Sequence, residues 1–308
     1  MVIPTPYFNF IVYIYPNTDD AATNNITNGG GTGFLMGIES KISEKTHLYV
    51  VTNAHILENL EKMGAQECVL RINTKNDKTE SLVTKIEDWD KHSENDDLAI
   101  YLLEPKDNWR FEYVVEEMLL KEEFVSTDIF GTKNDPKAAE IDIEDDGQER
   151  KWREVQKIGI GTDTVMVGRF IKHGGSGINY PVVRRGHIAM LPFEAMKQAG
   201  RNHLQEGFLV ETYSIGGFSG SPVFIQTALN KKHSKHDSTG SGTTYGEHVF
   251  LLGIDWGHFD FEGEVITTDA TTLKIPSGMM CVVPSWKLAE LIYSESVTNK
   301  RFVAEQAH

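Results

Sequence analysis

Short runs of apolar and β-branched residues recur along almost the whole chain, separated by turn-forming residues. Runs of about four to eight such residues, bounded by Gly, Asn and Pro, are typical of β-strands. They are FNFIVYIY (8–15), GFLMGI (33–38), HLYVVT (47–52), CVLRI (68–72), LAIYLL (98–103), TVMVGRF (164–170), FLVET (208–212), PVFI (222–225), VFLLGIDW (249–256) and MMCVV (279–283). Neither an alternation of strands with helices nor a long repeat accompanies them, so the pattern predicts an all-β sandwich or barrel.

Four segments depart from this pattern. Residues 106–126 carry apolar positions at roughly helical spacing and are expected to contain a short helix. Residues 133–157 are heavily charged, which predicts a solvated insertion, and the polar, Gly- and Ser-rich residues 227–247 are expected to form a mobile hairpin loop. Near the C-terminus, Ser285 is a candidate N-cap of a helix whose apolar face begins at Trp286.

Composition narrows the class of partner. The chain has 308 residues, of which 40% are hydrophobic, enough for one large domain or two small ones. Its 30 basic and 45 acidic residues give a net charge of −15, which repels nucleic-acid phosphates and anionic membranes, so neither partner is expected. No apolar run approaches the roughly 20 residues of a membrane-spanning helix, and the N-terminus lacks the features of a signal peptide. Only two cysteines are present, Cys68 and Cys281, which favours a reducing, cytoplasmic setting.

The stretch GGFSGSPVF (216–224) could hold a nucleophile on a tight turn. A serine hydroxyl becomes a good nucleophile only when a base takes its proton and a third group orients that base. Besides Ser219, the candidates are His55, at the polar exit of the apolar strand in VVTNAHIL, and Asp97, at the entry of the strand in ENDDLAIYLL. The chain order His, Asp, Ser is that of chymotrypsin and differs from the orders of subtilisins and α/β-hydrolases.

These motifs resemble the conserved boxes of trypsin-like serine proteases. TNAHIL is similar to the family's T-A-A-H box, NDDLAI to its D-hydrophobic-A box, and GFSGSP to its G-x-S-G-G-P box, with Ser221 in place of the second glycine. GGTGFLM, TVMVGRF, RRGHIAM and LLGIDWG are further similarities in the family's order. SGMMCVVPSWKLAEL resembles the ending of the high-temperature-requirement type of bacterial protease, here without sequence for a separate PDZ domain.

The resemblance implies two antiparallel six-stranded β-barrels with the active site between them, followed by a C-terminal helix. Residues 1–105 would form the N-terminal barrel with the His and Asp of the triad. Residues 106–160 would connect the barrels and include the acidic insertion. Residues 161–308 would form the C-terminal barrel, with the nucleophile, and the helix.

The resemblance also assigns chemical roles. Ser219 would attack the scissile carbonyl, His55 would take its proton and pass it to the leaving amine, and Asp97 would hold the imidazole tautomer. The backbone N–H groups of Gly217 and Ser219 would form the oxyanion hole. Neither a metal nor an organic cofactor is expected. Asp96 is the alternative orienting carboxylate, while the plain structural alternatives are a hydrogen-bonded strand-end histidine and a turn serine.

Substrate-binding positions follow from the same comparison. The resemblance places Tyr213, Ser214, Asp255, Trp256 and Gly257 along the substrate. Tyr213 stands where trypsins carry the Asp that binds basic side chains, so no preference for Lys or Arg is expected. Asp255 replaces the usual Ser close to the orienting carboxylate. The Asp255 carboxyl is therefore protonated, or its side chain turns away from the orienting carboxylate, or the alignment of this segment with the family motif is shifted.

The predicted function is that of a serine endopeptidase acting on a peptide or protein substrate. Two alternatives remain open: a catalytically silent peptide-binding module, and an esterase that uses the same triad. Because Phe218 replaces the zymogen Asp that pairs with a new N-terminus, no N-terminal processing is expected. Control would come from ordering of loops, with 216–220 and 172–180 as candidates, by a partner or by the peptide. The motif His233-x-x-His236-Asp237 lies in a polar tract with lysines, which favours a solvated loop over a metal site.

Overall fold

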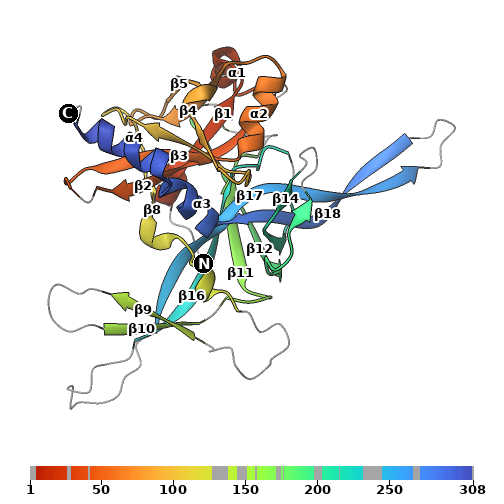
Figure 1. Cartoon of the computed structure of the whole chain (residues 1–308). Coiled ribbons are helices and arrows are strands. Elements are labelled where there is room, and N and C mark those ends of the chain that lie inside the picture. The colour runs from red at the N-terminus through yellow and green to blue at the C-terminus, as the bar shows by residue number, and fades with distance from the viewer. Residues whose placement is uncertain are drawn as a thin grey trace.

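The apolar runs form strands, and the strands make two largely antiparallel sheets that lie side by side (Figure 1). The computed structural model describes residues 5–25, 29–40, 42–126, 138–143, 151–156, 158–170, 175, 177–197, 203–214, 216–231, 245–265 and 271–306. The predicted all-β class is confirmed, since the helices are short or lie at the C-terminal end. The motif at 233–237, and part of the tract at 172–180, lie outside the described residues.

The first sheet is an open half-barrel. Its strands are β1 (Ile11–Tyr15), β2 (Gly31–Glu39), β3 (Thr46–Thr52), β4 (Glu67–Asn73), β5 (Thr79–Lys85), β6 (Asp90–Lys91), β7 (Ala99–Leu103) and β8 (Val114–Val115). They pair in the order β5-β4-β1-β2-β3-β7-β6, and β8 lies parallel to β2. Between them lie η1 (Thr5–Phe10), α1 (Thr18–Thr23), α2 (Ala54–Lys62) and η2 (Ile86–Asp88).

The second sheet closes on itself. Its strands are β9 (Ala138–Ile143), β10 (Lys151–Gln156), β11 (Asp163–Gly168), β12 (Val182–Met190), β15 (Phe208–Glu211), β16 (Pro222–Lys231), β17 (Tyr245–Val265) and β18 (Thr271–Pro284). The order β11-β12-β15-β18-β17-β16 returns to β11 through a β11–β16 ladder, which makes a closed six-stranded barrel. A separate two-stranded ladder joins β13 (Met196–Lys197) to β14 (Leu204–Gln205).

The prediction of two six-stranded barrels is therefore met by the second sheet and is wrong for the first. No ladder joins the edge strands β5 and β6 among the described strands. The reason lies in β6, which has only two residues before the chain turns into a loop with three buried polar side chains, His92, Asp96 and Asp97. A strand of two residues offers few backbone groups for a ladder with β5.

The helix expected within 106–126 is absent from the structure. The segment instead contains β8, η3 (Glu116–Met118) and η4 (Glu122–Phe124). Its backbone pairs with both sheets: Val114 pairs with Met36 of the first sheet, whereas Leu119 forms a bridge to Leu251 of the second. An extended segment reaches both sheets, which a helix of the same length could not do.

The two polar segments are partly strands. β9 and β10 pair as a hairpin within the acidic insertion, and β10 continues the second sheet beside β16. β16 and β17 extend into the segment expected to be a loop, to Lys231 and from Tyr245. β17 and β18 also run beyond the barrel as a long two-stranded arm that projects from the body of the molecule (Figure 1).

Two helices end the chain. α3 (Ser285–Ile292) confirms the predicted C-terminal helix, and α4 (Glu295–Gln306) follows it. The expected N-cap is wrong by one residue: Pro284 occupies that position, and Ser285 is the first helical residue. Its hydroxyl is engaged elsewhere, accepting from the Leu120 N–H at 2.9 Å and donating to the Leu120 carbonyl at 3.2 Å.

The two sheets share buried contacts where they meet. Phe10 packs edge-on against Phe224, with 5.7 Å between ring centroids. Arg169 follows β11 and inserts its guanidinium over the rings of Tyr15 and Tyr13, at 4.3 and 5.0 Å from their centroids. Stacking on aromatic faces compensates part of the cost of burying this cation. The junction between the sheets, where the candidate site lies, is thus packed by apolar and aromatic groups.

Both cysteines are buried free thiols. In the part of the chain that the structure describes, no helix is long and apolar enough to cross a membrane.

Candidate active site

His55 and Asp97 form a doubly hydrogen-bonded pair. His55 lies in the first turn of α2, directly after β3, and Asp97 lies in the loop before β7. The His55 backbone N–H donates to Asp97 Oδ1 at 2.8 Å, and His55 Nδ1 lies 2.6 Å from Asp97 Oδ2. A buried carboxylate beside Nδ1 favours the tautomer that carries its proton there. The Nε2 nitrogen is then the one able to accept a proton.

The backbone around Asp97 is fixed from both sides. The Asn53 side chain donates to the Asp97 carbonyl at 2.8 Å, and the Asp97 N–H donates to Gln205 Oε1 at 2.9 Å. Asp96 points elsewhere: its Oδ1 accepts from Gln205 Nε2 at 2.8 Å, and its Oδ2 lies 3.3 Å from His92 Nδ1. Of the two candidate carboxylates, the one that contacts His55 is therefore Asp97.

The turn that carries Ser219 is docked onto the first sheet. The Thr32 N–H donates to the Ser219 carbonyl at 2.9 Å, and the Thr32 hydroxyl donates to the Gly217 carbonyl at 2.8 Å. Gly220 has φ +87°, and a Cβ there would overlap the Thr32 carbonyl oxygen and crowd Thr52 Oγ1. Only glycine combines that backbone conformation with so close an approach. Because Thr52 ends β3, three residues before the candidate base, the serine turn packs against the strand that leads to His55.

Asp255 lies behind this turn and is fully buried. Its main chain holds the turn, since its carbonyl accepts from the Gly220 N–H at 2.8 Å and its N–H donates to the Ser221 carbonyl at 2.9 Å. Its carboxyl accepts from the Ser214 hydroxyl at 3.1 Å and from the Gly257 N–H at 2.9 Å.

Burial raises the pKa of Asp255 to about 7, against the smaller lowering effects of Ser214, Gly257 and the charge of His55. The side chain is therefore not turned out to solvent. Asp255 carries a proton below about pH 7 and lies within the electrostatic field of His55.

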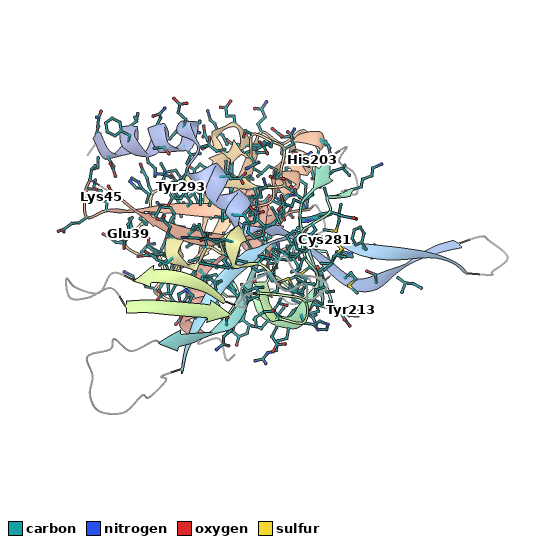
Figure 2. The ribbon with its side chains drawn as sticks, turned by 60° about the horizontal axis from the view of Figure 1, so that its bottom comes forward. Glu39, Lys45, His203, Tyr213, Cys281 and Tyr293 are labelled. Atoms are coloured by element: carbon teal, nitrogen blue, oxygen red, sulfur yellow. The ribbon has the colours of Figure 1, made fainter. Side chains whose placement is uncertain are left out.

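The remaining predicted substrate-binding residues differ in exposure. Ser214 and Trp256 are buried, whereas Tyr213 is 58% exposed. Figure 2 shows Tyr213 on the outer side of the part of the molecule built around the second sheet, apart from Cys281 at the base of the β17–β18 arm. Gly257 pairs with Cys281 across that arm. Burial raises the pKa of the Cys281 thiol well above its usual value, so this thiol is un-ionised at neutral pH.

Gln205 and Thr32 are site residues that sequence reasoning missed. Gln205 comes from the second half of the chain, yet its amide contacts both Asp96 and Asp97 of the first. In the sequence, Thr32 stands out only as part of GGTGFLM, although its N–H and hydroxyl hold the serine turn. Neither residue belongs to a recognisable sequence motif, because the groups that each one contacts are distant in sequence.

Comparisons with known proteins were made on sequence and on structure. No protein-family model matches the chain, and no curated protein matches it in sequence. Among solved structures, the crystal structure of Deg5 is similar over 88% of this chain and 85% of its own, with a TM-score of 0.40 and 15% identity. An inactive mutant form of Rv3671c from M. tuberculosis H37Rv is similar over 93% of this chain and 87% of its own, with a TM-score of 0.38 and 13% identity.

Proposed function

We propose that this chain is a trypsin-like serine endopeptidase. The observation that carries the proposal is the doubly hydrogen-bonded pair of His55 and Asp97. The docking of the Ser219 turn onto Thr32 of the first sheet supports it. In this mechanism Ser219 attacks the scissile carbonyl while His55 Nε2 takes its proton, and Asp97 stabilises the imidazolium. The backbone N–H groups of Gly217 and Ser219 stabilise the oxyanion. The acyl-enzyme that forms is then hydrolysed by water.

A fluorophosphonate probe tests this proposal, because it forms a covalent bond only with an activated serine. We expect labelling of the wild-type chain at Ser219, located by peptide mass spectrometry, and its loss in His55→Ala. Ser221 is the internal control, since its hydroxyl is fully buried two residues away. An unlabelled wild-type protein that still binds peptides would instead be the silent module. A labelled protein that cleaves only small esters would be the esterase.

The residue before the scissile bond is expected to be small or medium-sized and apolar. Tyr213 offers no carboxylate to a basic side chain, and Gly257 leaves room beside the wall formed by Trp256. Matched peptides that differ only at this residue measure the preference as kcat/KM. A strong preference for Arg or Lys would contradict this prediction. A long-range attraction of basic substrates to the acidic protein would show as salt dependence instead.

Gln205→Met is expected to lower kcat by about 10- to 100-fold with a much smaller change in KM, in the range typical of residues that orient a catalytic group. Methionine keeps the length of the side chain but removes the acceptor for the Asp97 N–H, so the carboxylate that orients His55 loses one of its fixed positions. Gln66→Met, at an exposed position, is the matched control. Equal kinetics of both variants and the wild type would show that Gln205 does not position the triad.

A further inference from the structure

A second group of polar side chains lies on the other side of the loop that carries Asp97. Each of His92, Asp96 and Glu290 offers one nitrogen or oxygen atom that could bind a metal ion, and these three atoms lie within 4.8 Å of one another. His92 and Asp96 are only 6% and 5% exposed, whereas Glu290, on α3, is at the surface. His203 lies next to them, with Nε2 3.7 Å from Asp96 Oδ1. Figure 2 shows His203 beside the first half of the molecule, although it belongs to the second.

Among the residues that the structure describes, three buried atoms of this group have no hydrogen-bond partner: His92 Nδ1, Asp96 Oδ2 and His203 Nε2. The first two lie 3.3 Å apart without hydrogen-bond geometry. Buried polar atoms almost always have a hydrogen-bond partner, and leaving one without a partner destabilises the folded state. Three of them at one place therefore indicate a missing ligand that accepts electron pairs from nitrogen and oxygen.

The spacing of these atoms suits a metal ion. Zinc ligands at about 2.0–2.2 Å in a tetrahedron lie roughly 3.3–3.6 Å from one another. His92 Nδ1 and Asp96 Oδ2, 3.3 Å apart, have this spacing. His203 Nε2 lies 3.7 Å from the other Asp96 oxygen, Oδ1, and Glu290 Oε2 lies 3.4 Å from the other His92 nitrogen, Nε2, so a shared ion requires both side chains to turn. Glu290 approaches the other ring nitrogen of His92, so its side chain has to turn toward Nδ1, which its surface position allows.

We propose that His92, Asp96 and Glu290 bind a zinc-like divalent cation, with His203 turning in as the fourth ligand. Two imidazoles with two carboxylates favour zinc over calcium and magnesium, which prefer sites made of oxygen ligands alone. This site differs from the sequence-based expectation of a metal-free protein. That expectation considered only the His233 motif, because His92, Asp96, His203 and Glu290 are too far apart in the chain to form a motif.

The surrounding charges fit a divalent ion. Lys287 Nζ lies 3.2 Å from Glu290 Oε2, 3.9 Å from Asp96 Oδ2 and 4.0 Å from Glu206 Oε2. The three carboxylates and the one ammonium together contribute a net charge of −2. The ammonium lies at the rim of the site and opposes the cation, so its removal should strengthen binding.

The proposed metal would stiffen the loop that orients the catalytic base, a consequence that rests on the proposed function. Gln205 donates to Asp96 Oδ1 with Nε2 and accepts from the Asp97 N–H with Oε1. Fixing Asp96 on a metal thus fixes the residue that precedes Asp97 and the amide that bridges both. The ion itself stays remote from the reacting atoms and takes no part in the bond changes.

Zinc titration of the full-length chain after removal of metals by a chelator tests the site. We expect one Zn²⁺ per chain, a higher melting temperature with Zn²⁺ and little change with Mg²⁺ or Ca²⁺. His92→Ala and Asp96→Asn should weaken binding by at least about 100-fold, whereas Lys287→Met should strengthen it. His258→Ala, which removes a histidine of the arm, is the matched control and should bind like the wild type.

Two results would overturn the proposal. One is the absence of saturable Zn²⁺ binding to the wild type. The other is binding that survives His92→Ala but is lost in a His233→Ala, His236→Ala double variant. The titrations are repeated on Ser219→Ala, in which no turnover occurs, so metal binding is measured independently of catalysis. A protein that binds zinc but fails to label with the serine probe would keep the metal site and refute the protease.

Discussion

Ser219→Ala is expected to lower the rate of peptide hydrolysis by about 10⁴- to 10⁶-fold, the usual effect of removing a member of a catalytic triad. The hydroxyl is the only group of the proposed site that forms a bond to the substrate. The fold should not change, because the turn is held by the Ser219 carbonyl and by Gly220, which alanine at 219 leaves in place.

Single-turnover and steady-state rates on one peptide substrate measure this effect. Ser221→Ala is the control: its hydroxyl is buried and has no hydrogen-bond partner among the described residues, so its removal should cost little activity. A Ser219→Ala protein that retained a tenth of the wild-type rate would refute the assignment of the nucleophile.

Asp255→Asn is expected to raise the free energy of unfolding above pH 7 by on the order of 4 kcal/mol. The pKa of Asp255 is about 7 in the folded protein, against an ordinary value of 3.8. Between about pH 4 and pH 7 the folded state holds a proton that the unfolded state has lost, so stability falls as pH rises through this window. Asparagine removes this dependence while keeping an acceptor for the Gly257 N–H and an amide that can donate to Ser214.

Urea unfolding of wild type and variant at intervals from pH 4 to pH 9 measures the difference. Asp107→Asn, the same substitution at an exposed position, is the control and should leave the pH profile unchanged. Parallel profiles for wild type and Asp255→Asn would show that the buried carboxyl does not titrate near pH 7.

The local sequence pattern predicted the strands well because burial of apolar runs decides them directly. It did not predict the extended course of residues 106–126. The same apolar spacing is compatible with a helix that packs on one sheet and with an extended segment that contacts two sheets. The second arrangement forms because Met36 and Leu251, the pairing partners of this segment, lie in different sheets. The local pattern likewise does not predict whether a sheet closes into a barrel, because closure depends on pairing between the two edge strands.

The candidate site could be predicted only in its short motifs. His55, Asp97 and Ser219 stand in recognisable boxes because their chemistry demands particular residue types. Gln205 could not be found in this way, because any side chain with an acceptor and a donor at that point in space would serve. The proposed metal ligands are similarly scattered over about 200 residues of sequence and come together only through the fold.

The open sheet and the closed barrel give the two halves of the site unequal resistance to local opening. Asp97 lies in the loop after β6, an edge strand of the open sheet, whereas Ser219 precedes β16, which has a neighbour on each side within the closed barrel. An edge strand can detach without breaking the rest of its sheet, while a strand of a closed ring separates only when two ladders break. Amide hydrogen exchange in residues 90–98 should therefore be faster than in β16 and β17, as mass spectrometry of exchanged peptides would reveal. On warming, we expect the contact between His55 and Asp97 to be lost while the barrel that carries Ser219 is still intact. The proposed activity should then disappear below the temperature at which the protein unfolds.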